Sequence, residues 1–141
     1  MAAGAPDELL SMCRTEWPRL VGALSLYTGD PGTAEDVAQD AFVRLCRDWT
    51  RVQRHGNPTG WLFRVGFNVA NSHYRRRGVE RRWRAAQPEP NRVDSSADGA
   101  DAVAVRRVLL TVPVDERAVL VLRFYGQLTL REVAAVLGIP E

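Results

Sequence analysis

The stretch AEDVAQDAFVRL, residues 34–45, decides the fold together with NPTGWLFRVGFNVANSHYRRR, residues 57–77. In the first stretch, apolar residues recur at spacings of three and four, as they do on the buried face of a helix. The pattern predicts a helix from Thr33 to about Trp49 with a polar opposite face. The second stretch repeats this spacing, so both indicate an all-α fold.

A capping signal marks the start of the second stretch. Asn57 precedes Pro58, and an asparagine cap followed by proline at the first helical position is typical of a helix start. We predict a helix from Pro58 to about Arg77. The polar and basic segment 50–56 before it is predicted to be a loop.

Upstream, a helix is predicted from Pro6 to Tyr27, where apolar residues again recur at spacings of three and four. Pro18 lies inside this pattern, removes one backbone donor and crowds the preceding turn. We therefore expect a kink or a restart of the helix near Glu16.

The C-terminal part carries three shorter helical patterns, over residues 102–110, 115–125 and 130–137. Thr129 and Glu132 have the spacing of a capping box, and Gly138 suits a left-handed helix end. A short helix, a glycine and a turn form the first half of a helix-turn-helix, and Pro140 suits the start of a second helix. A plain structural hairpin is the alternative interpretation.

Residues 87–99, QPEPNRVDSSADG, contain two prolines, two serines and almost no bulky apolar residue, which is typical of a flexible linker. The sequence therefore predicts two small helical domains, 6–84 and 101–141, joined by a linker over 85–100.

The composition excludes several classes of protein. Apolar residues make up 45% and charged residues 26% of the chain, and the longest run of large apolar residues, Val119 to Leu122, is too short to cross a bilayer. The N-terminus lacks the basic start and apolar core of a secretory signal. We expect a soluble, cytoplasmic protein without membrane insertion.

Cys13 and Cys46 have no close Cys or His to complete a metal site, and both fall on apolar helical positions. They are interpreted as reduced, buried thiols, with a disulfide between them left open. His55 and His73 lie near no nucleophile motif, and the sequence has no glycine-rich phosphate loop. We expect neither an enzyme nor a bound metal or cofactor.

The basic residues are all arginines, 19 in number, and they cluster. The segment RRRGVERRWR, residues 75–84, holds six arginines against the single acid Glu80. Such a block is an electrostatic footprint for nucleic-acid phosphate. A solvated basic helix end is the alternative.

The order of these features, with VLLTVPVDERAVLVLRFYGQLTLREVAAVLGIPE at residues 108–141, resembles the extracytoplasmic-function (group IV) sigma factors of bacterial RNA polymerase over nearly the whole chain. The resemblance implies that the first domain, sigma region 2, binds core RNA polymerase and recognises and melts the minus-ten promoter element. It implies that the second domain is a partial region 4 for the minus-thirty-five element. The sequence resembles a factor truncated within the helix-turn-helix, so no base-reading residue is assigned there.

The resemblance also assigns candidate site residues. The polar face of the helix over 33–49 would contact the clamp of the polymerase's largest subunit through Asp36, Gln39, Asp40 and Arg44, with a solvated surface as the alternative. The candidates for contact with minus-ten DNA are Arg51, Gln53, Arg54, His55, Asn57, Trp61, Arg64, Asn68, Asn71, Arg75, Arg76, Arg77, Arg81 and Arg82. The candidates for backbone contact with upstream DNA are Arg123, Thr129 and Arg131.

Two of these side chains carry specific chemistry. The Asn68 amide has both a donor and an acceptor, so it can pair with the edge of a flipped non-template base, and an ordinary exposed asparagine is the alternative. Trp61 could stack on an unpaired base, but a role in the core is favoured. Leu122, Phe124 and Tyr125 are expected in the core or at the polymerase flap.

The resemblance implies that the second domain is without the helix that would cover its apolar side. We expect an apolar surface that docks on the first domain, on an anti-sigma helix or on another copy. This surface is formed by Val119, Leu122, Val133, Val136 and Leu137. The expected partners are core RNA polymerase, promoter DNA and an anti-sigma factor. A stand-alone helix-turn-helix regulator is the alternative function, and the acid-and-amide face of the helix over 33–49 argues against it.

Overall fold

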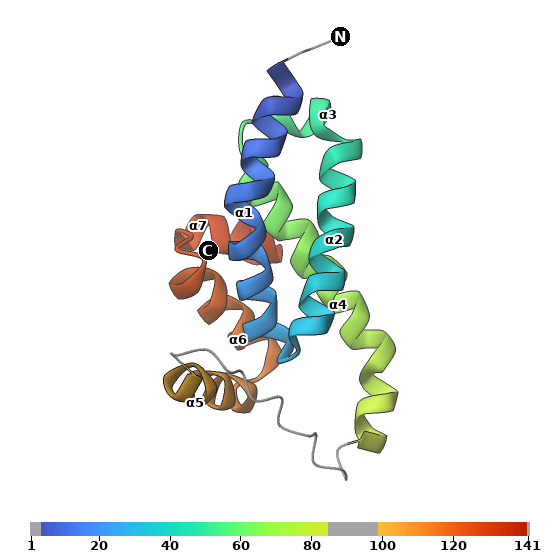
Figure 1. The fold of residues 1–141 in the computed structure, drawn as a ribbon. Coiled ribbons are helices and arrows are strands. Elements are labelled where there is room, and N and C mark those ends of the chain that lie inside the picture. Colours follow the sequence, from blue (N-terminus) through green and yellow to red (C-terminus); the bar gives the residue numbers. More distant parts are fainter. Residues whose placement is uncertain (1–3, 85–98, 141) are drawn as a thin grey trace.

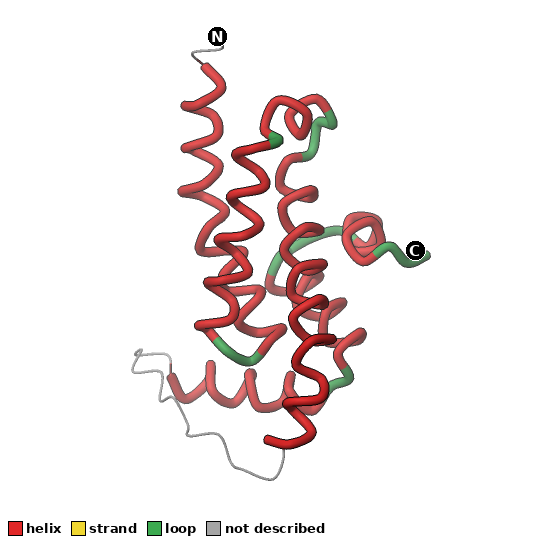
Figure 2. Tube along the Cα trace, turned by 90° about the vertical axis from the view of Figure 1, so that its right-hand side faces the viewer, coloured by secondary structure: helices red, strands yellow, loops and turns green. Residues whose placement is uncertain are grey.

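The computed structural model describes residues 4–84 and 99–140, with side chains over 7–73, 101 and 103–140. All regular structure in these residues is helical (Figures 1 and 2). The elements are α1 (Gly4–Thr28), α2 (Pro31–Arg47), α3 (Trp49–Arg54), α4 (Pro58–Arg84), α5 (Gly99–Thr111), α6 (Val114–Leu120), η1 (Val121–Tyr125) and α7 (Leu130–Leu137). The all-α fold class predicted from the sequence is confirmed.

The core of the N-terminal part lies between α1, α2 and α4, which pack against one another. Aromatic rings from all three helices meet there. Trp17 contacts Phe42 with ring centroids 5.4 Å apart, and Tyr27 contacts Phe67 at 4.9 Å. The fully buried side chains of Leu20 and other apolar residues fill the space around these rings.

Helix α1 is continuous through Pro18, so of the two predicted alternatives the restart near Glu16 is wrong, and the kink stays a prediction. Proline removes one donor to the preceding turn, which destabilises a helix by about 3 kcal/mol. Pro18 lies on the exposed side of α1, where water can satisfy the carbonyl that it leaves free. Burial of Leu20 and Leu24 on the other side offsets the loss.

The segment predicted as a loop over 50–56 contains most of a short helix, α3, which begins at Trp49. Packing against the core explains why this segment is helical. Trp49 and Val52 lie one turn apart and are 8% and 0% exposed, so both reach the core from the same side of the helix. The true turn is only three residues long, from His55 to Asn57.

The predicted helix ends are largely confirmed. Asn57 Oδ1 accepts a hydrogen bond from the Gly60 amide at 3.1 Å at the start of α4. Helix α7 begins with the predicted capping box of Thr129 and Glu132 and ends at Gly138, which has φ 68°. A left-handed residue at this place costs a glycine little, because it has no Cβ. Helix α4 runs to Arg84 and is longer than predicted.

The two cysteines are less buried than predicted. Cys13 is half-buried and Cys46 is exposed, so the interpretation of two buried thiols is wrong for Cys46. Burial raises the pKa of the Cys13 thiol above its ordinary value of 9.0, and the neighbouring Cys46 thiol raises it further. Both cysteines are free, and they face each other across α1 and α2.

The C-terminal helices pack on the N-terminal ones and share their core. Leu122, Val133 and Val136 are at most 3% exposed, and Val119 and Leu137 are half-buried against the same cluster. Of the three occupants predicted as alternatives for this surface, the structure shows the first domain, and α6 lies beside α1 in Figure 1. The linker prediction falls mainly on 85–98, outside the described residues.

Candidate functional site

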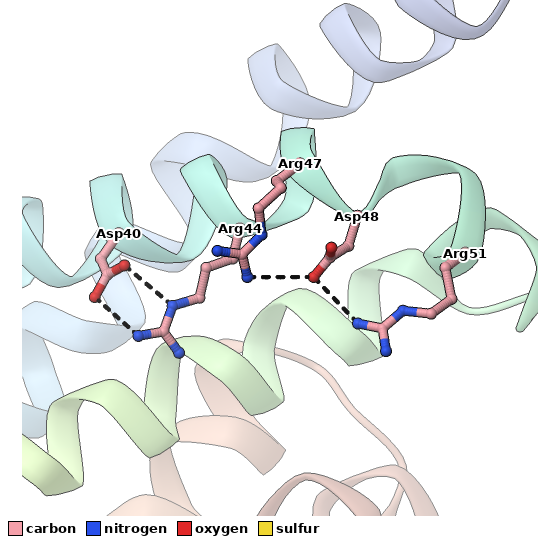
Figure 3. Close-up of polar contacts among 5 residues, drawn as sticks. All are labelled: Asp40, Arg44, Arg47, Asp48 and Arg51. Atoms are coloured by element: carbon pink, nitrogen blue, oxygen red, sulfur yellow. Dashed lines mark hydrogen bonds and ion pairs between the residues drawn. The ribbon is translucent and has the colours of Figure 1, made fainter.

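The predicted polymerase-binding residues share the outer side of α2. Asp36 and Gln39 are exposed, and in the described part of the chain neither makes a hydrogen bond or ion pair. Arg44 Nε donates to Asp40 Oδ1 at 3.1 Å (Figure 3). Both side chains are close to half exposed, so this pair contributes only about 0.3–0.5 kcal/mol. The face is an open polar surface with one internal ion pair.

A second group of charges follows at the junction of α2 and α3. Asp48 Oδ2 accepts from Arg51 Nη2 at 3.1 Å and pairs with Arg47 Nη2 at 3.5 Å (Figure 3). The two arginine side chains are 67% and 68% exposed, so their guanidinium groups remain open to an anion. Arg51 was predicted as a DNA contact. Arg47 and Asp48 were missed, although the three-residue spacing of Asp48 and Arg51 is a signal for a helical ion pair.

The other candidates around the turn between α3 and α4 are exposed. Arg54 and His55 project from this turn without burial. Gln53 Nε2 donates to Glu8 Oε2 at 2.6 Å, a contact from α3 to the first turns of α1 that the sequence did not reveal. Asn57 is exposed but uses its side-chain oxygen to cap α4. Its role in the structure is capping, and its amide nitrogen is left for another contact.

Helix α4 presents Arg64 and Asn68 on its exposed side, one turn apart. The backbone carbonyl of Asn68 accepts a hydrogen bond from Ser72 Oγ at 3.2 Å, which does not involve the Asn68 amide. The Asn68 side chain is exposed, and its amide makes no hydrogen bond with the described residues, so its donor and acceptor are both open to solvent. This is the arrangement that the base-pairing interpretation of Asn68 requires.

Asn71 and Trp61 point toward the protein. Asn71 Oδ1 accepts a hydrogen bond from the hydroxyl of Tyr27, which is buried, so this oxygen makes a structural contact, and the DNA contact of Asn71 stays a prediction. Trp61 is half-buried and packs against the core cluster, which confirms the interpretation favoured for it. Helical spacing alone placed both residues with Asn68, and it did not show how wide the buried face of α4 is.

The arginine block lies at the end of α4. The helix backbone passes through this block and ends at Arg84. The side chains of the predicted contacts lie outside the described residues. These contacts are Arg75, Arg76, Arg77, Arg81 and Arg82.

The C-terminal candidates for DNA contact differ in the contacts that their side chains already make within the protein. The Thr129 hydroxyl accepts from the Glu132 amide at 3.1 Å, so it serves as a helix cap. Arg123 Nη1 donates to the Leu128 carbonyl at 3.2 Å, and its guanidinium lies 5.9 Å from the Phe124 ring centroid. Arg131 is exposed. Of the predicted core or flap residues, Leu122 is in the core, whereas Phe124 is 72% exposed.

The described residues hold no cluster of three or more His, Cys, Asp or Glu side chains that could bind a metal ion. Among the same residues, no helix is long and apolar enough to cross a membrane.

Comparison with known protein families matches both parts of the chain. Residues 13–80 match the family model of Sigma-70 region 2, and residues 108–141 match that of Sigma-70 region 4. These segments correspond to the α1–α4 unit and to the C-terminal helices. The fold and both matches define a sigma factor of bacterial RNA polymerase.

Similar proteins indicate which group of sigma factors the chain belongs to. The chain is 33% identical to the ECF RNA polymerase sigma factor SigE of Mycolicibacterium smegmatis, over 94% of this chain and 53% of that protein. It is 29% identical to the RNA polymerase sigma-E factor of Streptomyces avermitilis, over 98% of this chain and 77% of the relative. No solved structure matches significantly. The chain belongs to the extracytoplasmic-function group of the sigma-70 family, whose members act in transcription initiation.

Proposed function

We propose that this sigma factor binds core RNA polymerase through the outer face of α2 and captures a non-template base of the minus-ten element beside α4. The proposal rests on the difference between the two sides of α2, α3 and α4. Their inner sides form the core, and their outer sides carry the polar candidates without burying them. Asp36, Gln39 and the Asp40–Arg44 pair present acids and an amide, which suit a basic partner helix.

Capture of a base needs a group that reads its edge and groups that hold the strand. Asn68 supplies an outward-facing amide, and Arg64 lies one turn before it to contact a phosphate. Gln53 comes from the last turn of α3, and His55 comes from the turn that precedes α4. A flipped base between this turn and the exposed side of α4 would find both donors and acceptors, while phosphate contacts would fix the register of the strand.

Charge reversal tests the polymerase contact. The double variant Asp36→Arg, Asp40→Arg should weaken binding to core RNA polymerase by about 30-fold or more, because it places cations against a basic surface. The control Asp7→Arg, Glu116→Arg makes the same change of charge at two exposed positions outside the face and should bind normally. Equal affinity of the two double variants, with circular dichroism unchanged, would remove α2 from the interface.

Substitution of Asn68 tests base capture. Asn68→Ala should lower the preference for one base at the flipped position by about tenfold, within the range of one bidentate amide contact. The control is Ser72→Ala, one turn along the exposed side of α4, which should keep the preference. The probes are four single-stranded minus-ten oligonucleotides that differ at one base, bound by the holoenzyme. Equal affinity of the parent protein for all four would contradict the assignment.

Salt dependence tests the contribution of the arginines. If about four of them reach phosphate, log affinity for a single strand should fall against log salt with a slope near −3. Asn68→Ala should leave that slope unchanged, because an amide releases no counterions. A slope near zero would show that phosphate contacts are not part of the complex.

A further inference from the structure

Helices α1 and α2 form an antiparallel hairpin that brings two cysteines to the same level (Figure 1). The register follows from one aromatic contact, in which the rings of Trp17 and Phe42 have centroids 5.4 Å apart. Cys13 lies one turn before Trp17 on α1, and Cys46 lies one turn after Phe42 on α2. Because residues four positions apart share a side of a helix, the two thiols are the next pair along the same seam.

The seam stays closed beyond the cysteines. Gln53 Nε2 of α3 donates to Glu8 Oε2 of α1 at 2.6 Å, so the chain segments remain in contact on the far side of the pair. The hairpin is also narrow, because Ala38 and Ala41 of α2 are fully buried and small side chains let helices approach closely. The two thiols are thus held opposite each other, with a contact between the helices on either side.

The thiols differ in their access to solvent. Cys46 is exposed, whereas Cys13 is half-buried. Burial raises the pKa of the Cys13 thiol, and the charge and hydrogen bonding of the neighbouring Cys46 thiol raise it further. An oxidant from solution therefore meets Cys46 first, and Cys13 is the adjacent thiol that can react with the product.

We propose that Cys13 and Cys46 are an oxidation site, at which a peroxide converts the two thiols to a disulfide between α1 and α2. The Cys46 thiolate attacks the O–O bond of hydrogen peroxide, takes up one oxygen as a sulfenic acid and releases hydroxide. The Cys13 sulfur then displaces the sulfenic hydroxyl, so the S–O bond breaks as the S–S bond forms. The protons of the two thiols complete two water molecules, and the two electrons that leave the sulfurs reduce the peroxide.

The disulfide stabilises the hairpin that carries the polar face of α2. It closes residues 13–46 into a loop that contains the turn between the helices and nearly all of α2. A cross-link of this kind restricts the unfolded chain, and for a loop of this length it should raise the urea midpoint by about 1–2 M. A dithiol reductant reverses the reaction by thiol–disulfide exchange. This chemistry needs neither polymerase nor DNA, so its test is independent of the proposed function.

The test treats the reduced full chain with hydrogen peroxide, blocks the remaining thiols with N-ethylmaleimide and measures the intact mass. Cys13→Ser and Cys46→Ser each leave one thiol. The matched control Cys46→Ser, Val43→Cys keeps two thiols, but Val43 is 63% exposed and lies one turn away from the level of Cys13. Serine is close in size to cysteine, so the reduced variants should share the circular dichroism of the parent chain.

The parent chain should lose two hydrogens, leave no thiol for the maleimide and remain monomeric, and a peptide map should link Cys13 to Cys46. Its urea midpoint should rise by about 1–2 M on oxidation and return after dithiothreitol. In Cys13→Ser, the sulfenic acid at Cys46 should persist and react with dimedone. The control with Val43→Cys should form no internal disulfide and show no rise in the midpoint.

Three results would overturn the oxidation site. The first is that both thiols of the parent chain survive peroxide that oxidises Cys46 in the Cys13→Ser variant. The second is a disulfide-linked dimer in place of the internal disulfide. The third is equally fast closure by the relocated pair with Val43→Cys, because exposure of a thiol, and not the register of the hairpin, would then decide the reaction.

Discussion

The hydrogen bond from Tyr27 to Asn71 gives the most direct quantitative prediction. Tyr27→Phe removes the hydroxyl from a residue that is 1% exposed and leaves the half-buried Asn71 oxygen without its donor. Loss of one partner from such a pair lowers the free energy of unfolding by about 1–2 kcal/mol. With a urea dependence of about 2 kcal/mol per molar, the midpoint should fall by about 0.5–1 M.

Tryptophan fluorescence provides the assay, because Trp17, Trp49 and Trp61 all lie in the α1–α4 unit. Asn71→Ala should destabilise the protein by a similar amount, and the double variant should be less destabilised than the sum by about 1 kcal/mol. Ser72→Ala, at the exposed neighbour of Asn71, should change stability by less than about 0.5 kcal/mol. A coupling energy near zero would refute the assignment of Asn71 to the interior and return it to the DNA-facing candidates.

Four further predictions concern individual side chains. Thr129→Ala should lower the free energy of unfolding by about 1 kcal/mol in thermal melts through loss of the α7 cap, and Thr129→Ser should restore it. Iodoacetamide should modify Cys46 faster than Cys13 in native protein at pH 8–9, because the pKa of Cys13 is raised. In urea, the two cysteines should be modified at similar rates. Since the folded state retains the Cys13 proton more tightly, the free energy of unfolding should decrease as pH rises past 9.0. Arg44→Ala should change stability by less than about 0.5 kcal/mol yet weaken polymerase binding, and a larger loss of stability would mean that the pair is structural.

Local signals in the sequence predicted the helices and their ends. The cap at Asn57, the capping box at Thr129 and the left-handed Gly138 each depend on residues within one turn, so the sequence carries the whole signal. The predictions of a helix restart near Pro18 and of a loop in place of α3 failed for a different reason. In both places, burial of residues such as Val52 outweighed a local preference, and burial depends on the rest of the fold.

Among the site residues, too, those that depend on local signals could be predicted and those that depend on the rest of the fold could not. The exposed candidates on α2 and Asn68 on α4 could be predicted, because the side of a helix that carries no apolar residues faces solvent. Asn71 could not be separated from them, because its partner Tyr27 belongs to another helix. The contact of Arg117 with Tyr27 joins residues 90 positions apart and is made to a backbone carbonyl, which has no residue-specific signature in a sequence.

We propose that this chain acts on a promoter only together with core polymerase and that it captures a single base there. The most direct measurement uses a promoter fragment enriched from genomic DNA by the reconstituted holoenzyme, with 2-aminopurine at successive non-template positions of the minus-ten element. We expect a rise in fluorescence at one position when core polymerase and the chain are both present, and a loss of that rise with Asn68→Ala. The same signal from the chain without polymerase would contradict the proposed function and favour a stand-alone DNA-binding regulator.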